Sequence, residues 1–201
     1  MSSACARCPR VLGTSCCEVK GDEQLATLTW ADVDRLLEAT GRGSESFCEW
    51  EWMSPEAAAR WSLLHPQWGR YFGPSTRRLT LKRAKGACVF HGPDGCTLTA
   101  QQRPTACRLY PFEVRAPGDW GLQVDRFGSV EDALHSGEHA CLAIEEADSF
   151  QTLWEAFGTD GEALEALGER LRQEAAEHSK REQASPALQS KAPSQRRSAV
   201  I

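Results

Sequence analysis

The chain has 201 residues, a formal net charge of -5, 41% hydrophobic residues and 25% charged residues. This length suits one ordinary domain with an apolar core, and the composition excludes a fibrous or wholly disordered protein. The acidic balance argues against nucleic acid as a partner, because phosphate binding draws on a surplus of Lys and Arg.

The N-terminal half contains two helix signals. Thr29 can cap a helix over 29–40, and Asp32 stands at the third position, where an acidic side chain is favourable. Ser54 followed by proline is typical of a helix start, which predicts a second helix over 54–65. Both segments place apolar residues at helical spacing.

The middle of the chain favours short strands. Alternating apolar residues over 79–81 and the pair 89–90 predict two strands around Gly86. The segments 112–115 and 122–127 predict a further hairpin. Its connection contains the turn residues Pro117, Gly118 and Gly121.

The C-terminal part favours helices and then a tail. A short helix is expected after Ser129, and a long helical region over 148–183 is broken at Gly158 and Gly161. The final residues lack periodic apolar positions and predict disorder. The expected organisation is a metal-binding domain at 1–147, a helical extension at 148–178 and a disordered tail at 179–201.

The first residues show neither a basic start nor an apolar core, so no secretory signal peptide is expected. No apolar run approaches the ~20 residues that cross a bilayer. We therefore expect a cytoplasmic protein that does not associate with a membrane.

Cysteine is the unusual component. Nine cysteines stand at positions 5, 8, 16, 17, 48, 88, 96, 107 and 141. Disulfides are rare in a reducing cytosol, so a cysteine-rich intracellular chain is more often a metal binder than a disulfide scaffold. The odd total also leaves one cysteine over in any fully paired scheme.

The first four cysteines form two pairs. Cys5 and Cys8 have the C-x-x-C spacing that lets two thiolates face one ion. A thioredoxin-like redox role would need a preceding strand and a following helix, which this position lacks. Cys16 and Cys17 are adjacent, which suits two neighbouring sites or one ligand beside a packed thiol, and spacing does not separate these cases.

The later cysteines are brought together by turns. The turn signal between Cys88 and Cys96 returns these two residues toward each other. Pro104 can start a short helix that carries Cys107. If the fold brings Cys141 to the same place, these residues form a plausible four-thiolate set.

Cations and histidines accompany the cysteines. Four thiolates around a divalent ion leave about -2 on the site, and neighbouring guanidinium groups can donate hydrogen bonds to sulfur. The arginines that flank cysteines are Arg7, Arg10, Arg103 and Arg108. His91 and His139 are the rival ligands, since each stands close in sequence to a cysteine.

The ordered cysteines and the string Arg103-Pro104-x-x-Cys107-Arg108-x-Tyr110-Pro111-Phe112 resemble the YkgJ-type cysteine cluster family. That family is described as a zinc- or iron-chelating domain and is similar to part of the flagellin lysine N-methylases. The resemblance covers about residues 5–145 and leaves Cys48 as the spare. It implies eight metal ligands, namely Cys5, Cys8, Cys16, Cys17, Cys88, Cys96, Cys107 and Cys141.

The sequence therefore predicts a small irregular α+β domain that is stabilised by metal. Zinc and an iron–sulfur cluster remain alternatives, because ligation by four cysteines serves both. The biological role is open between a metal-binding protein, a protein lysine N-methylase-like enzyme and a metal-dependent module that binds a protein partner. The chain has no glycine-rich loop for a nucleotide-like cofactor and no C-x-x-x-C-x-x-C spacing.

Overall fold

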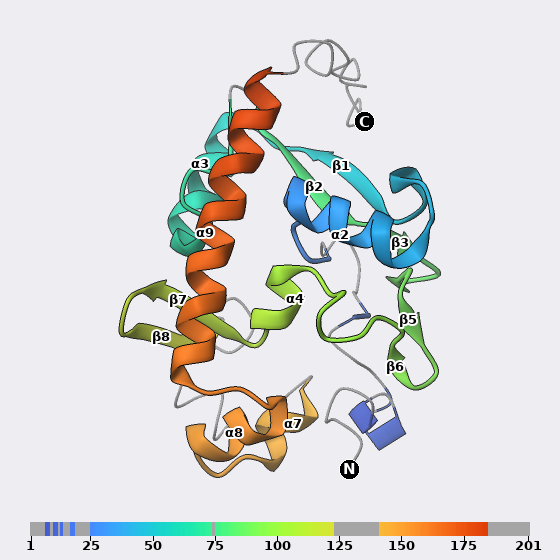
Figure 1. Cartoon of the computed structure of the whole chain (residues 1–201), viewed down its shortest axis with the longest axis vertical. Coiled ribbons are helices and arrows are strands. Elements are labelled where there is room, and N and C mark those ends of the chain that lie inside the picture. Colours follow the sequence, from blue (N-terminus) through green and yellow to red (C-terminus); the bar gives the residue numbers. More distant parts are fainter. Residues whose placement is uncertain are drawn as a thin grey trace, which may run out of the picture.

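The structure is a computed structural model that describes residues 7, 8, 10, 11, 13, 17, 18, 25–73, 75–122 and 141–184. It mixes helices with short antiparallel strands, which confirms the predicted α+β class (Figure 1). Within these residues the strands form four separate two-stranded sheets. None of the helices in this part of the chain has the length and apolar character that a membrane span requires.

The two N-terminal helices begin where their caps predict. Helix α2 (Trp30–Thr40) starts after Thr29, which forms a reciprocal capping box with Asp32. Helix α3 (Pro55–Leu64) starts after Ser54, whose side chain accepts a backbone N–H. Two short 3-10 turns follow these helices, η1 (Ser44–Ser46) and η2 (Pro66–Trp68).

The predicted strand over 79–81 is confirmed within β2 (Arg77–Leu81), but its partner is β1 (Cys48–Trp52), which the sequence did not predict. The strand expected at 89–90 is wrong. A tight hairpin instead joins β3 (Arg83–Ala84) to β4 (Ala87–Cys88). Lys85 and Gly86 both have positive φ, and such two-residue turns pair the residues immediately flanking them.

Two further hairpins follow. The turn expected between Cys88 and Cys96 joins β5 (His91–Gly92) to β6 (Gly95–Cys96). The later hairpin pairs β7 (Phe112–Ala116) with β8 (Asp119–Leu122). The second strand begins at 119 rather than 122, because the turn is confined to Pro117 and Gly118, and Gly121 lies in β8 opposite Glu113. Residues 123–127 lie outside the described part.

The helical region after residue 141 contains α7 (Leu142–Glu146), α8 (Phe150–Phe157) and α9 (Gly161–Ala184). The predicted break is confirmed, since Gly158 ends α8 with a φ of 63°. Helix α9 continues past residue 179, where the tail was expected to begin, because Ser179 and Glu182 are buried against the rest of the protein. The helix expected after Ser129 and the tail from 185 lie outside the described residues.

Two apolar clusters form the interior. The α2 core comprises Leu25, Leu28, Val33, Leu36, Phe47, Leu79, Leu81, Cys88, Phe90 and Leu98. The α9 core comprises Trp68, Tyr71, Leu109, Phe112, Val114, Leu122, Cys141, Ala143, Ile144, Leu153, Leu164, Leu171 and Ala175. Helix α9 packs against α2, η2, β7 and the short helix α4 (Thr105–Leu109). The predicted helical extension is therefore packed along the cysteine-containing part (Figure 1).

Close packing at Gly168 sets the approach of α9 to β7. A Cβ atom at this position would lie 2.6 Å from the Cβ of the fully buried Val114. We expect Gly168→Ala to lower the free energy of unfolding by about 1–3 kcal/mol, because this overlap outweighs the helix propensity of alanine. Urea denaturation measures the change.

Gly161 provides the matched control for this substitution. It begins the same helix, and a Cβ there would come no closer than 3.8 Å to Trp154. Gly161→Ala should leave the free energy of unfolding unchanged or slightly raised. Equal effects of the two substitutions would contradict the packing argument.

Candidate metal centre

Helix α4, which carries Cys107, is held at its N-terminus by buried polar groups of two other helices. The Thr105 amide donates to Asp32 Oδ1 at 2.8 Å, and the Thr105 hydroxyl donates to Glu174 Oε2 at 2.7 Å. Arg35 donates to both carboxylates, at 2.6 Å to Asp32 and 2.8 Å to Glu174. The position of Cys107 is therefore fixed between α2 and α9.

Short hairpins position the cysteines at 88 and 96. The Cys88 amide donates to the carbonyl of Cys17 at 2.8 Å, which ties the N-terminal segment to β4. The Phe90 carbonyl accepts from the amide of Thr97 at 2.8 Å and from its hydroxyl at 3.1 Å. These bonds close the loop from 88 to 97 and hold both of its cysteines on one side of the molecule.

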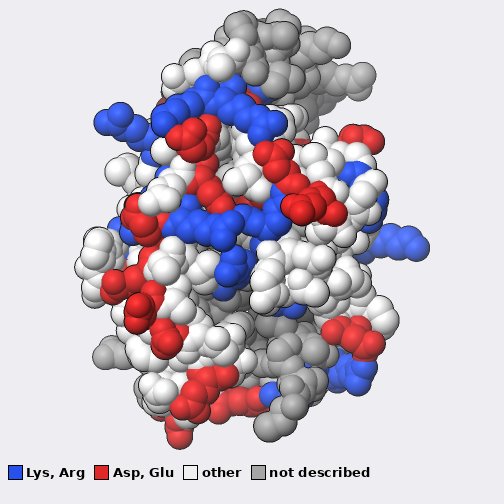
Figure 2. Space-filling view, viewed as in Figure 1, with Lys and Arg blue, Asp and Glu red and all other residues white. Residues whose placement is uncertain are grey.

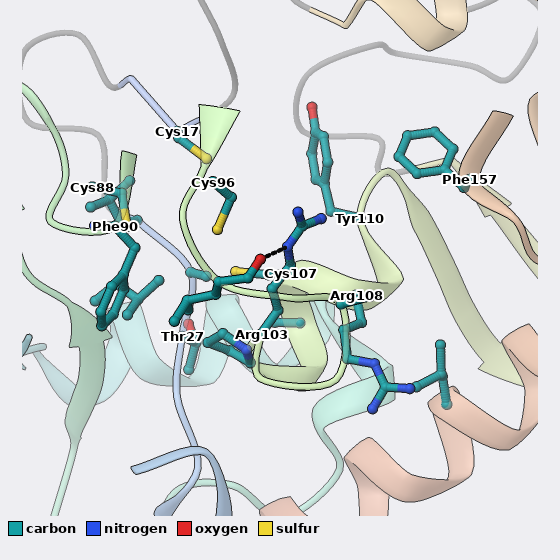
Figure 3. A pocket seen from close by; sticks show the side chains of 18 of the residues that line it. Cys17, Thr27, Cys88, Phe90, Cys96, Arg103, Cys107, Arg108, Tyr110 and Phe157 are labelled. Atoms are coloured by element: carbon teal, nitrogen blue, oxygen red, sulfur yellow. Dashed lines mark hydrogen bonds between the residues drawn. The ribbon is translucent and has the colours of Figure 1, made fainter. Parts of the chain in front are cut away.

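A cavity of about 780 Å³ lies where the two cores meet, with walls that include Leu81 and Phe90 of the α2 core and Trp68 and Ala143 of the α9 core. Six of the eight predicted ligands line it, namely Cys8, Cys17, Cys88, Cys96, Cys107 and Cys141. Figure 3 shows four sulfur atoms turned toward one shared space, those of Cys17, Cys88, Cys96 and Cys107. Cys5 and Cys16 lie outside the described residues.

These thiols influence one another electrostatically. Burial raises the pKa of Cys107 well above its usual value, and Cys17, Cys88 and Cys96 raise it further. Burial also raises the pKa of Cys88 to about 12, although the Phe90 amide donates to its sulfur at 3.5 Å and acts in the opposite direction. Several thiolates held close together and partly buried repel each other, so their common ionisation requires a compensating cation.

As the side chains stand, no group of three or more His, Cys, Asp or Glu residues in the described part of the chain could hold a metal ion. The chemistry of the wall nevertheless suits soft metals, because thiolates are the donors that zinc and iron–sulfur clusters take. The cysteine side chains therefore suit zinc or an iron–sulfur cluster as ligands. The described residues do not form a closed coordination shell.

The remaining predicted residues fall into separate places. Cys48 does not line the cavity; its thiol contacts the Ser44 carbonyl at 3.1 Å, and burial raises its pKa to about 11. His91 lines the cavity, with Nε2 at 3.8 Å from a Glu18 carboxylate oxygen. His65 also lines the cavity, which the sequence did not predict. His139 lies outside the described residues.

The flanking arginines have different surroundings. Arg7 pairs with Glu146 at 2.6 Å, and Arg10 pairs with Asp94. Arg103 lines the cavity and donates from Nε to the Leu98 carbonyl at 3.2 Å, the bond drawn in Figure 3. The Arg108 side chain runs from α4 away from the sulfur atoms (Figure 3).

No protein-family model matches the chain, and no curated protein or solved structure is significantly similar to it. The arguments for its function therefore rest on the residues of the cavity.

Proposed function

We propose that this chain binds a metal, as zinc or as an iron–sulfur cluster, through the cysteines that line the cavity between the two cores. The observation that carries the proposal is the convergence of thiols from separate segments. Cys17 lies N-terminal to α2, Cys88 and Cys96 belong to hairpins, and Cys107 belongs to α4. All four nevertheless line one cavity.

The inner ligand set is Cys17, Cys88, Cys96 and Cys107, since these sulfur atoms face each other and are electrostatically coupled. Cys8 and Cys141 line the same cavity and extend the set. Cys5 and Cys16 enter it through the sequence resemblance alone. When bound, the metal supplies the positive charge that lets buried thiols ionise together.

A structural role follows from where the cavity lies. Its walls come from both the α2 core and the α9 core, so ligation would add a cross-link between segments that already meet through packing and hydrogen bonds. Metal affinity then contributes directly to folding stability.

The test is metal analysis of protein purified without air, together with its ultraviolet-visible spectrum. We expect stoichiometric zinc in a colourless protein, or iron, acid-labile sulfide and absorbance near ~400 nm in a brown one. Cys107→Ser and Cys96→Ser should each lose most of the bound metal, because each removes a donor from the inner set. Far-UV circular dichroism checks that the variants retain their helices.

Cys48→Ser is the matched control. Its thiol is partly buried but contacts Ser44 rather than the cavity, so this variant should keep the metal content of the parent protein. Protein that holds neither metal, or equal loss of metal from the Cys48 and Cys107 variants, would refute the proposal.

A further inference from the structure

Three arginines from three helices meet at the side of the cavity away from the inner thiols. Arg35 comes from α2, Arg108 from α4 and Arg170 from α9. Arg35 and Arg170 lie near enough to Arg108 to act on it electrostatically. Both Arg108 and Arg170 line the cavity. Figure 2 shows Lys and Arg side chains gathered in a band across the middle of the face on which α9 lies.

The nearby carboxylates are already used by other groups. Glu174 Oε1 accepts from Arg35 and from Arg170, each at 2.8 Å, and Oε2 accepts from the Thr105 hydroxyl. Asp32 accepts from the capping residue Thr29 as well as from Arg35. The guanidinium groups of Arg35 and Arg170 thus share two carboxylates that also accept from backbone and hydroxyl groups of the fold.

Arg108 does not share these two carboxylates through a hydrogen bond or an ion pair. Within residues 25–73, 75–122 and 141–184, no hydrogen bond or ion pair reaches its side chain, although it is partly buried. Glu174 and Asp32 act on Arg108 electrostatically, but burial and the cations Arg170 and Arg35 have the larger effects and lower its pKa. A further anion beside this partly desolvated cation would therefore be favourable. The cavity that Arg108 lines has the volume of a small-molecule site, and its neighbouring wall contains Ala106, Ala163 and Leu167.

We propose that Arg108 and Arg170 bind the oxyanion group, phosphate or carboxylate, of a small molecule that enters this cavity. A guanidinium presents parallel N–H donors that match two oxygens of such a group. Arg35 adds positive charge and is itself held by Asp32 and Glu174, so it does not move to reach the ligand. The ligand would lie on the arginine side of the cavity, away from the inner thiols, and its binding does not require a metal.

The experiment is calorimetric titration of the full chain with inorganic phosphate and with succinate, at matched ionic strength and with chloride as the reference. We expect one saturable site in the millimolar range or tighter for at least one of the two oxyanions. The better ligand distinguishes a phosphate source from a carboxylate source. Arg108→Gln and Arg170→Gln should each weaken binding by roughly tenfold, the loss expected for one charge-assisted hydrogen-bonding group.

Arg42→Gln is the control, because it removes the same charge from an exposed position after α2. It should leave the affinity unchanged. Binding of neither oxyanion, or equal affinity in the Arg108 variant and the parent protein, would overturn the proposal, as would an equal loss in the Arg42 variant. Metal content measured on the same samples keeps this result separate from the proposed metal function, since neither Arg108 nor Arg170 belongs to the ligand set.

Discussion

Glu182→Ala should lower the free energy of unfolding by about 3–5 kcal/mol, the cost of leaving one member of a buried ion pair without its partner. Arg77 and Glu182 side chains are each 4% exposed, and Arg77 Nε donates to Glu182 at 2.8 Å. The same carboxylate accepts from Trp30 Nε1 at 3.0 Å. The substitution therefore removes the carboxylate that balances the charge of a buried guanidinium and accepts from an indole N–H, where α9 joins the β1–β2 sheet.

Urea denaturation with a circular dichroism readout measures this loss. The double substitution Arg77→Met with Glu182→Leu removes both charges and should cost less than the single one. Glu177→Ala on the same helix is the surface control, because its pair with Lys180 is about 70% exposed at both side chains, and we expect less than about 1 kcal/mol. Equal effects at 182 and 177 would contradict the prediction.

Stability should fall as the pH is lowered from about 6.5 toward 3, because His178 resists protonation in the folded state. Burial, together with the smaller effects of the cations Arg77 and Arg181, lowers the pKa of His178 to about 3. His178 is 1% exposed, and its ring stacks on that of Tyr71 with 4.3 Å between the ring centroids. Its Nδ1 has no hydrogen-bond partner in the described part of the chain. The unfolded state binds a proton in this window that the folded state does not.

The expected slope is about 1.4 kcal/mol per pH unit from this residue. His178→Phe keeps a ring against Tyr71 and removes the titrating group. Urea denaturation of both proteins between about pH 7 and 4 isolates the contribution as the difference between their curves. Parallel curves would contradict the assignment.

The elements that the sequence predicts well are those specified by adjacent residues. Thr29 with Asp32 and Ser54 with Pro55 each satisfy backbone donors within one turn, so these helix starts follow from local chemistry. The sheet between β1 and β2 does not follow in this way. The register places Trp50 opposite Leu79, and such a pairing depends on the packing of the α2 core.

In the candidate site, too, the sequence predicted the features that adjacent residues specify and missed those that depend on distant residues. The turn after Cys88 and the proline before α4 are local signals, and they place Cys96 and Cys107 on the wall of the cavity. The burial of His178 and Glu182 was not predictable, because the residues around them are polar and their partners lie about one hundred residues earlier in the chain. The same reasoning explains why the hydrogen bond from the Thr105 amide to Asp32 was not predicted, since these residues lie 73 positions apart.

The Asp32 carboxylate accepts from the Thr29 amide in the capping box of α2 and also from the first amide of α4, which comes 73 residues later in the chain. One carboxyl group thus fixes the position of α4 relative to α2. The position of Cys107 relative to α2 is specified by this shared acceptor rather than by the length or path of the segment that joins them. Changes in the intervening loops can accumulate without displacing the thiol, whereas Asp32 itself has little freedom to vary.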